Sequence, residues 1–144
     1  MKPINFFTTE EEKKIVEAIA KAEKNTSGEI KVHIDSKSKK EPLERAKKVF
    51  EKLNMQNTKD RNGVLFHICI KQRNFSIIGD KGIHEKVSQQ FWDEIRNEVI
   101  TKFQQGIFAE ALIDAILKSG EKLKLYFPYQ TDDKNEISNE ISKD

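Results

Sequence analysis

Apolar residues at helical spacing predict a helix close to the start of the chain. Thr8-x-x-Glu11 and Thr9-x-x-Glu12 both match a capping box, in which a hydroxyl and a carboxylate satisfy free backbone N–H groups. The helix is therefore expected to begin at Thr8 or Thr9 and to end in the polar stretch 25–28. Its buried stripe is predicted to consist of Ile15, Ala18, Ile19 and Ala22.

Two strand patterns follow. Strict alternation over residues 29–35 predicts a first strand. Its two faces would carry Ile30, Val32 and Ile34 on one side, and Glu29, Lys31, His33 and Asp35 on the other. Residues 64–70 are almost continuously apolar, as expected of a central strand covered on both faces. A helix opening at Glu41-Pro42 separates the strands, so this order predicts a right-handed crossover and parallel pairing.

The second half of the chain predicts one more strand and two helices. The link 71–74 is short enough to allow only a hairpin, so a strand over 75–79 should run antiparallel to the central strand. Apolar residues four apart predict one long helix over 83–103, with Phe91 in the core and Trp92 partly exposed. A further helix over 107–123 should end before Phe127-Pro128.

These elements predict an α/β fold, namely a three-layer α/β/α sandwich with a small mixed sheet and helices on both faces. Residues 1–128 would form a single domain. Residues 129–144 hold only three large apolar side chains, so they are expected to form a disordered polar tail. Those three residues are Tyr129, Ile137 and Ile141.

Composition narrows the function classes. The chain has 144 residues, of which 35% are charged, yet Lys and Arg (26) nearly balance Asp and Glu (24), giving a net charge of +2. Such a balance disfavours a nucleic-acid partner, which would require a basic face. Neither a signal peptide nor a stretch of about 20 apolar residues is visible, so we expect a cytoplasmic protein without membrane insertion.

The predicted topology gathers oxygen-bearing side chains at one edge of the sheet. The first two strands would start there and the third would end there, which brings Glu29, Asp60, Asn62 and Asp80 together. Carboxylate and amide oxygens are the ligands that Ca²⁺ and Mg²⁺ prefer, so these four residues form a candidate metal site. The same residues also suit ordinary roles, since Asp80 could cap a helix and Asn62-Gly63 could form a turn.

The helix that follows the third strand opens at this edge. Its first turn contains Lys81, Gly82 and His84, which are candidate contacts for an anion such as phosphate. A solvent-exposed role for His84 is the simpler interpretation. His33 and His67 lie on neighbouring strands, but we interpret them as structural because no ligand repeats at metal-binding spacing around them. Cys69, in an apolar run, is expected to be a buried and inert thiol.

The ordered set of turns resembles the TPM domain family. The resemblance lies in Thr26-Ser27-Gly28-Glu29, Asn62-Gly63-Val64-Leu65 and Gly79-Asp80-Lys81-Gly82-Ile83, and it extends over residues 8–128. It implies an α/β/α sandwich, binding of a divalent cation (chiefly Ca²⁺) and an acid phosphatase activity. By position it also implies that Glu29, Asn62 with Asp60, and the turn 79–82 belong to the site. The chain has Ile83-His84 where the family usually has Leu-Glu.

Two functions follow as hypotheses. One is a soluble bacterial-type domain that binds Ca²⁺ or Mg²⁺ and has weak phosphatase activity toward a phosphorylated ligand, the ion polarising phosphate or water. The other is a non-catalytic module whose loops are ordered by the cation and which recruits a protein partner. Binding is favoured over catalysis because no activated nucleophile can be identified, and the catalytic residues stay unassigned.

Overall fold

A four-stranded mixed sheet forms the centre of the computed structural model, which describes residues 6–129 and 137–144. The strands are β1 (Glu29–Asp35), β2 (Gly63–Cys69), β3 (Asn74–Gly79) and β4 (Ser142–Lys143), arranged in the order β3-β2-β1-β4. β1 pairs in parallel with β2 and with β4, whereas β3 runs antiparallel to β2. The predicted pairing of the first three strands is confirmed.

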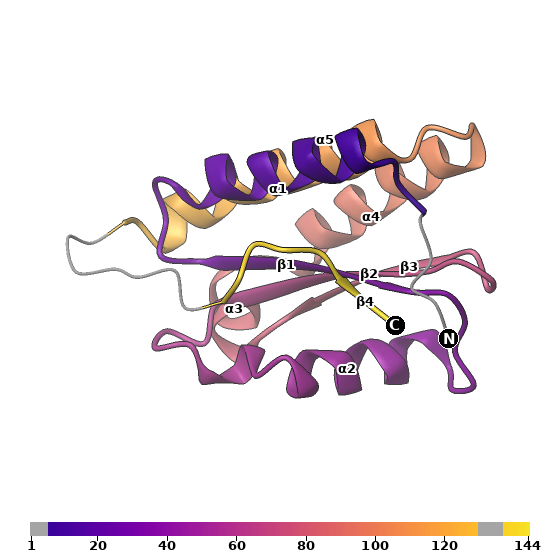
Figure 1. The fold of residues 1–144 in the computed structure, drawn as a ribbon. Helices are drawn as coiled ribbons and strands as arrows, with labels where there is room; N and C mark the ends of the chain where they lie inside the picture. Colours follow the sequence, from indigo (N-terminus) through magenta and orange to yellow (C-terminus); the bar gives the residue numbers. More distant parts are fainter. Residues whose placement is uncertain (1–5, 130–136) are drawn as a thin grey trace.

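Helices cover both faces of this sheet (Figure 1). One layer contains α1 (Thr9–Glu23), α4 (Gln89–Gln104) and α5 (Ala109–Tyr126), and α2 (Pro42–Lys52) lies on the opposite face. Two short elements complete the chain order: the 3₁₀ helix η1 (Met55–Asn57) lies between α2 and β2, and α3 (Lys81–Lys86) lies between β3 and α4. The predicted α/β/α sandwich is therefore confirmed.

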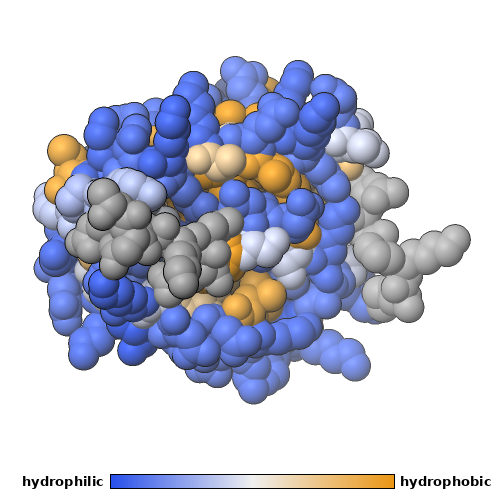
Figure 2. Space-filling model, turned by 60° about the vertical axis from the view of Figure 1, so that its left-hand side comes forward, coloured by the Kyte–Doolittle hydropathy of each residue, from blue (hydrophilic) through white to orange (hydrophobic). Residues whose placement is uncertain are grey.

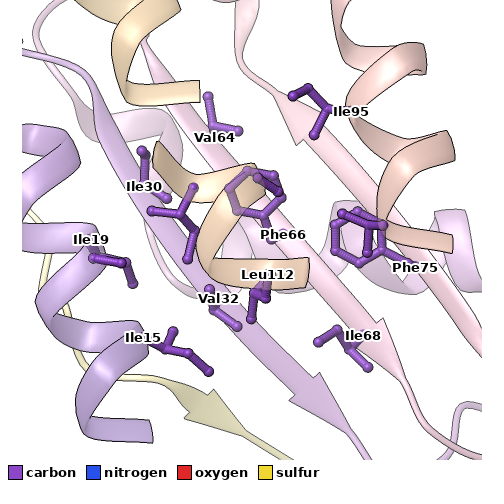
Figure 3. Close-up of a cluster of buried hydrophobic side chains, with 14 of the residues drawn as sticks. Ile15, Ile19, Ile30, Val32, Val64, Phe66, Ile68, Phe75, Ile95 and Leu112 are labelled. Carbon is purple, nitrogen blue, oxygen red and sulfur yellow. The ribbon is translucent and has the colours of Figure 1, made fainter. Parts of the chain in front are cut away.

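The main core lies between the sheet and the three-helix layer (Figure 3). Every second residue of β1 and β2 points into it, and α1 and α5 contribute the facing side chains. Central members are Ile15, Ile19, Ile30, Val32, Phe66, Phe75 and Leu112. A much smaller apolar cluster lies under α2, consisting of Val49, Phe50, Met55, Leu65 and Ile137. The face of β1 toward α2 is consequently free to hold buried polar groups.

The beginning of α1 follows the sequence prediction. The backbone N–H of Glu11 donates to the Thr8 hydroxyl at 3.0 Å, and the N–H of Thr8 donates to the Glu11 carboxylate at 2.9 Å. This completes the capping box and fixes the helix start.

The predicted long helix over 83–103 is wrong, because the chain is interrupted between α3 and α4. Val87 has extended backbone angles (φ −113°, ψ 129°), and the Ser88 hydroxyl accepts from the N–H of Phe91 as a new cap. Restarting the helix changes its rotation about its axis. Trp92 is therefore buried and Phe91 half-buried, the reverse of the expectation.

The expected disordered tail is also wrong for residues 137–144. Ile137 is buried in the cluster under α2, and Ile141 packs against the main core. β4 adds to the edge of β1, and Lys143 forms an ion pair with Glu12 of α1 at 2.6 Å. Two apolar side chains, a strand pairing and an ion pair thus dock this segment, while residues 130–136 lie outside the described part of the chain.

The high charge content lies mainly on the surface. On the face shown in Figure 2, hydrophilic residues surround small hydrophobic patches. No helix in the described residues is long and apolar enough to span a membrane.

Candidate metal centre

Two histidines and an aspartate meet on the face of the sheet that α2 covers. His33 of β1 lies directly opposite His67 of β2 in the parallel register, and Asp35 follows His33 by two residues on the same face. All three side chains are buried, with at most 2% of each exposed. The strict alternation of β1 and the register with β2 therefore position this group.

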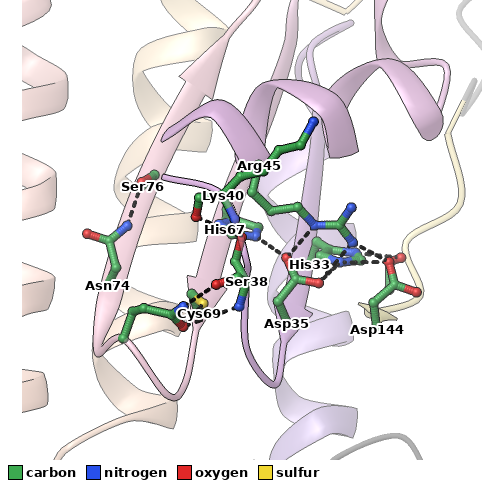
Figure 4. Close-up of polar contacts among 12 residues, drawn as sticks. His33, Asp35, Ser38, Lys40, Arg45, His67, Cys69, Asn74, Ser76 and Asp144 are labelled. Carbon is green, nitrogen blue, oxygen red and sulfur yellow. Dashed lines mark hydrogen bonds and ion pairs between the residues drawn. The ribbon is translucent and has the colours of Figure 1, made fainter. Parts of the chain in front are cut away.

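Asp35 bridges the two imidazole rings (Figure 4). Its Oδ1 lies 3.1 Å from Nε2 of His33, and its Oδ2 lies 2.6 Å from Nε2 of His67. The rings are nearly parallel, with centroids 5.8 Å apart and an interplanar angle of 7°. Both Nε2 atoms thus point at the same carboxylate.

Arg45 of α2 closes the group from the helix side. Its Nε and Nη2 donate to the two carboxylate oxygens of Asp35 at 2.9 and 3.0 Å. Burial alone would raise the pKa of Asp35, but the hydrogen bonds from His33, His67 and Arg45 outweigh it and hold that pKa well below its usual range. Asp35 is therefore a carboxylate at neutral pH.

The outer nitrogens of the two rings differ in their surroundings. Nδ1 of His33 lies 2.8 Å from the hydroxyl oxygen of Ser142, whereas Nδ1 of His67 is buried with no hydrogen-bond partner among the described residues. In the neutral rings, Nε2–H donates to Asp35 and Nδ1 carries the lone pair. A hydroxyl can donate or accept, so Ser142 suits either tautomer of His33.

The geometry suits a metal ion with mixed nitrogen and oxygen ligands. The ligand atoms of His33, Asp35 and His67 all lie within 4.8 Å of one another. Across residues 6–129 and 137–144, no other group of three or more His, Cys, Asp or Glu side chains meets this limit. Two imidazoles with a carboxylate are typical of zinc and similar transition metals, whereas Ca²⁺ and Mg²⁺ favour oxygen-only sets.

The four residues predicted as metal ligands lie at the expected edge of the sheet. Asn62 Nδ2 donates to the Ser27 hydroxyl at 3.2 Å, and that hydroxyl donates to Asp60 at 3.5 Å. Oδ1 of Asn62 is buried and has no hydrogen-bond partner among the described residues. The topology thus brings Asp60 and Asn62 together, and their role as ligands stays a prediction.

The other two predicted ligands have close protein partners. Asp80 receives two hydrogen bonds of 2.8 Å from Arg61 and caps α3 by accepting from the N–H of Lys81 at 2.7 Å. Glu29 is buried next to Glu23. Burial raises the pKa of Glu23, a backbone hydrogen bond from Ile30 lowers it, and the charge of Glu29 raises it again, which brings this pKa to about 8. Asp80 thus has both ordinary roles, cap and ion pair, at once.

The predicted anion contacts lie in a helix of only six residues, α3. Lys81 and His84 are exposed, and the N–H of Gly82 donates to the carbonyl of Arg61 at 2.8 Å. A Cβ on Gly82 would lie 2.3 Å from the carbonyl oxygen of Asp60, so this glycine allows two loops to touch. Phosphate binding by these three residues stays a prediction.

Comparison with known proteins gives the family. The family model described as the TPM domain matches residues 1–122. The chain belongs to the TPM domain family. The resemblance noted in the sequence is thereby confirmed.

This TPM domain is similar to two bacterial proteins with NMR structures. BA42 from the psychrophilic bacterium Bizionia argentinensis is 50% identical, has a TM-score of 0.89, and the match covers 95% of this chain and 94% of that one. The N-terminal domain of a P. gingivalis protein is 18% identical with a TM-score of 0.69, over 84% of this chain and 78% of that one, which supports the fold alone. No curated protein matches.

Sequence reasoning did not predict that His33, His67 and Asp35 meet in this TPM domain. The two histidines were expected on neighbouring strands and were interpreted as structural, because no ligand repeats at metal-binding spacing around them in the sequence. The signal was the alternation itself, since Asp35 shares a strand face with His33. Cys69, in contrast, is buried as expected, and burial raises the pKa of its thiol.

Proposed function

We propose that this TPM domain binds a divalent transition-metal ion, best represented by Zn²⁺, at His33, Asp35 and His67. The observation that carries the proposal is the convergence of their three ligand atoms within 4.8 Å in a buried place. In the metal-free state the two Nε2–H groups occupy the carboxylate. An ion would replace these hydrogen bonds with bonds from Nε2 and from an oxygen of Asp35.

The neighbours of the group support this assignment. Moving the proton of His33 from Nε2 to Nδ1 frees Nε2 for a metal, and the Ser142 hydroxyl at 2.8 Å can accept that proton's hydrogen bond. Arg45 can keep its hydrogen bonds to Asp35 from outside the coordination shell and orient the carboxylate.

Histidine variants give a matched test, because the chain has three histidines and one of them is exposed on α3. Zinc affinity is measured by isothermal titration for the wild type, His67→Gln and the control His84→Gln. We expect His67→Gln to weaken zinc binding at least about tenfold and His84→Gln to leave it unchanged. Bound Co²⁺ should give a visible d–d absorption, which should disappear when zinc displaces the Co²⁺ ion.

Folding of each variant is checked by its amide spectrum, and His33→Gln provides a second variant if His67→Gln does not fold. Zinc binding that is equal in all variants would reject the buried group as the site. The absence of any zinc binding to a folded wild-type protein would reject the proposal altogether.

We also propose a second, oxygen-rich site for Ca²⁺ or Mg²⁺ at Asp60 and Asn62. The buried Oδ1 of Asn62, which lacks a hydrogen-bond partner among the described residues, favours it. Amide shifts on titration with Ca²⁺ should cluster at residues 26–29, 58–63 and 79–84 and should be lost in Asp60→Asn. Asp93→Asn, an exposed position on α4, is the control. Shifts elsewhere, or unchanged shifts in Asp60→Asn, would contradict this site.

We propose that the function is binding and not catalysis, and that the domain is a non-catalytic interaction module. The one thiol of the chain, Cys69, is buried and has a raised pKa, so it does not supply an activated nucleophile. Weak phosphatase activity is the competing hypothesis. It requires hydrolysis of a generic phosphomonoester by the purified wild type, with loss in Asp60→Asn and retention in Asp93→Asn.

A further inference from the structure

A cavity of about 560 Å³ lies on the side of the sheet opposite the candidate metal centre. It opens between the turn that joins β2 to β3 and the region where α4 ends and α5 begins. Ile68 and Phe75 line its inner part, and both belong to the main core (Figure 3). Neighbouring residues of a strand point to opposite faces, so the sheet separates Ile68 from His67 and the cavity from the metal centre. A volume of this size is typical of a site for a small molecule.

Phenylalanine rings form much of the cavity wall. The ring centroid of Phe108 lies 4.9 Å from that of Phe6 and 5.3 Å from that of Phe103, both in edge-to-face arrangements. Phe75 extends this cluster inward, with its centroid 5.9 Å from that of Phe103. Phe108 is nevertheless 37% exposed. A ligand with an apolar body would cover this remaining aromatic surface, and removing such surface from water is favourable.

One charged side chain, that of Arg73, is present among the described residues that line the cavity, and no acidic residue is. Arg73 is exposed, and its N–H donates to the carbonyl of Ile70 at 3.1 Å, which fixes its backbone in the turn. Its guanidinium forms no hydrogen bond or ion pair within the described part of the chain. The basic side chains of α4 differ, because Arg96 donates to a backbone carbonyl at 3.0 Å and Lys102 forms an ion pair at 2.8 Å. A free guanidinium is thus available to an anion at the mouth of the cavity.

We propose that this cavity binds a small carboxylate with an apolar body, such as a medium-chain fatty acid. The apolar body lies against the phenylalanine rings, and the carboxylate accepts hydrogen bonds from the Arg73 guanidinium, whose planar fork matches a carboxylate. The charge of the lining favours an anion over a cation, and a neutral ligand would leave the guanidinium unused. This site is independent of the proposed metal binding, because the two lie on opposite faces of the sheet.

The first test titrates the wild type, Arg73→Gln and Lys71→Gln with octanoate and with octanol and follows binding by amide shifts. Lys71 is a matched control because it is an exposed cation in the same turn and does not line the cavity. Octanoate shifts should cluster at the residues that line the cavity. Arg73→Gln should weaken octanoate binding about fivefold or more and leave octanol binding unchanged, whereas Lys71→Gln should change neither. Octanoate binding that is equal in Arg73→Gln and the wild type would overturn the proposal, as would shifts scattered over the surface.

The second test concerns the apolar wall. Phe108→Ala should weaken the binding of both octanoate and octanol about threefold or more, because part of the aromatic surface that the ligand covers is removed. Glu110→Ala, at an exposed position in the first turn of α5 that does not line the cavity, is the control and should change neither affinity. Unchanged affinities in a folded Phe108→Ala would overturn the proposal. A ligand-free wild type that sediments as a dimer, and as a monomer in Phe108→Ala, would also overturn it, because a second copy of the chain would then be the occupant.

Discussion

Two glutamates, the half-buried Glu23 and the buried Glu29, lie together where the end of α1 reaches the start of β1. Oε2 of Glu23 accepts from the N–H of Ile30 at 2.7 Å, and Glu29 lies next to it. Burial raises the pKa of Glu23, the hydrogen bond from Ile30 lowers it, and the charge of Glu29 raises it further, to about 8 in all. Glu23 is therefore protonated in the folded protein at neutral pH.

The raised pKa of Glu23 predicts a pH dependence of stability with a definite sign. Between the ordinary pKa of 4.5 and the folded value of about 8, the folded state binds more protons than the unfolded state, so its contribution to stability falls as pH rises. Glu23→Gln mimics the protonated acid and should remove this loss. The difference in free energy of unfolding between Glu23→Gln and the wild type should therefore be more favourable to the variant at pH 8 than at pH 5, by on the order of 1 to 3 kcal/mol.

Urea unfolding of the wild type and of Glu23→Gln at both pH values measures this difference. Glu17→Gln, an exposed position on the same helix, serves as the control. Parallel stability curves for Glu23→Gln and the wild type would contradict the assignment.

The side-chain contacts of residues such as Glu23 could not be predicted from the sequence pattern. Parallel pairing of two strands was predictable from the order of elements, and it placed Glu29, Asp60, Asn62 and Asp80 at one edge correctly. The partners of these side chains were not predictable. Arg61, for example, binds Asp80 and has a left-handed backbone conformation (φ 50°), which a non-glycine residue adopts only occasionally and which the sequence pattern does not indicate.

The close contact between α1 and α5 depends on a glycine, Gly120, at the point where the two helices meet. A Cβ on Gly120 would lie 2.6 Å from Cβ of Ala22 and 2.8 Å from its Cα. In an exposed helix, glycine to alanine gains roughly 0.5–1 kcal/mol. Here the clash involves the facing backbone, which cannot move without separating the two helices.

Gly120→Ala should therefore destabilise the domain by about 1–3 kcal/mol, as overpacking in a core does. Chemical unfolding measures the change, with Glu121→Ala on the exposed side of α5 as a control for helix propensity. A stability equal to or above that of the wild type would mean that the two helices can separate at little cost.

The predicted element boundaries were wrong where the apolar spacing continued across a break between two helices. The four-residue spacing from Ile83 to Phe103 holds through Val87, yet Ser88 caps a new helix there. A hydroxyl cap in a run of apolar positions was the one local signal of the break. Similarly, Ile137 and Ile141 were read as too few to dock the tail, although each fills a separate part of the core.

At the scale of the molecule, the candidate metal centre is assembled from segments far apart in the chain. β1 supplies His33 and Asp35, β2 supplies His67, and α2 supplies Arg45. The pattern of each strand was predictable, and so was the neighbourhood of the two histidines. Their convergence on one carboxylate depends on the register between β1 and β2, which local spacing does not encode.

A ligand that joins this many elements should stabilise the whole fold and not one loop. At a free zinc concentration of 100 times the dissociation constant, binding only to the folded state adds about 2.7 kcal/mol, which corresponds to a rise in Tm of roughly 8 °C for a domain of this size. Thermal unfolding with zinc or with a chelator measures this rise. His84→Gln should show the full rise, and His67→Gln almost none. An equal rise in His67→Gln would mean that zinc binds elsewhere on the folded chain, because the stabilisation by zinc would then not depend on the buried group.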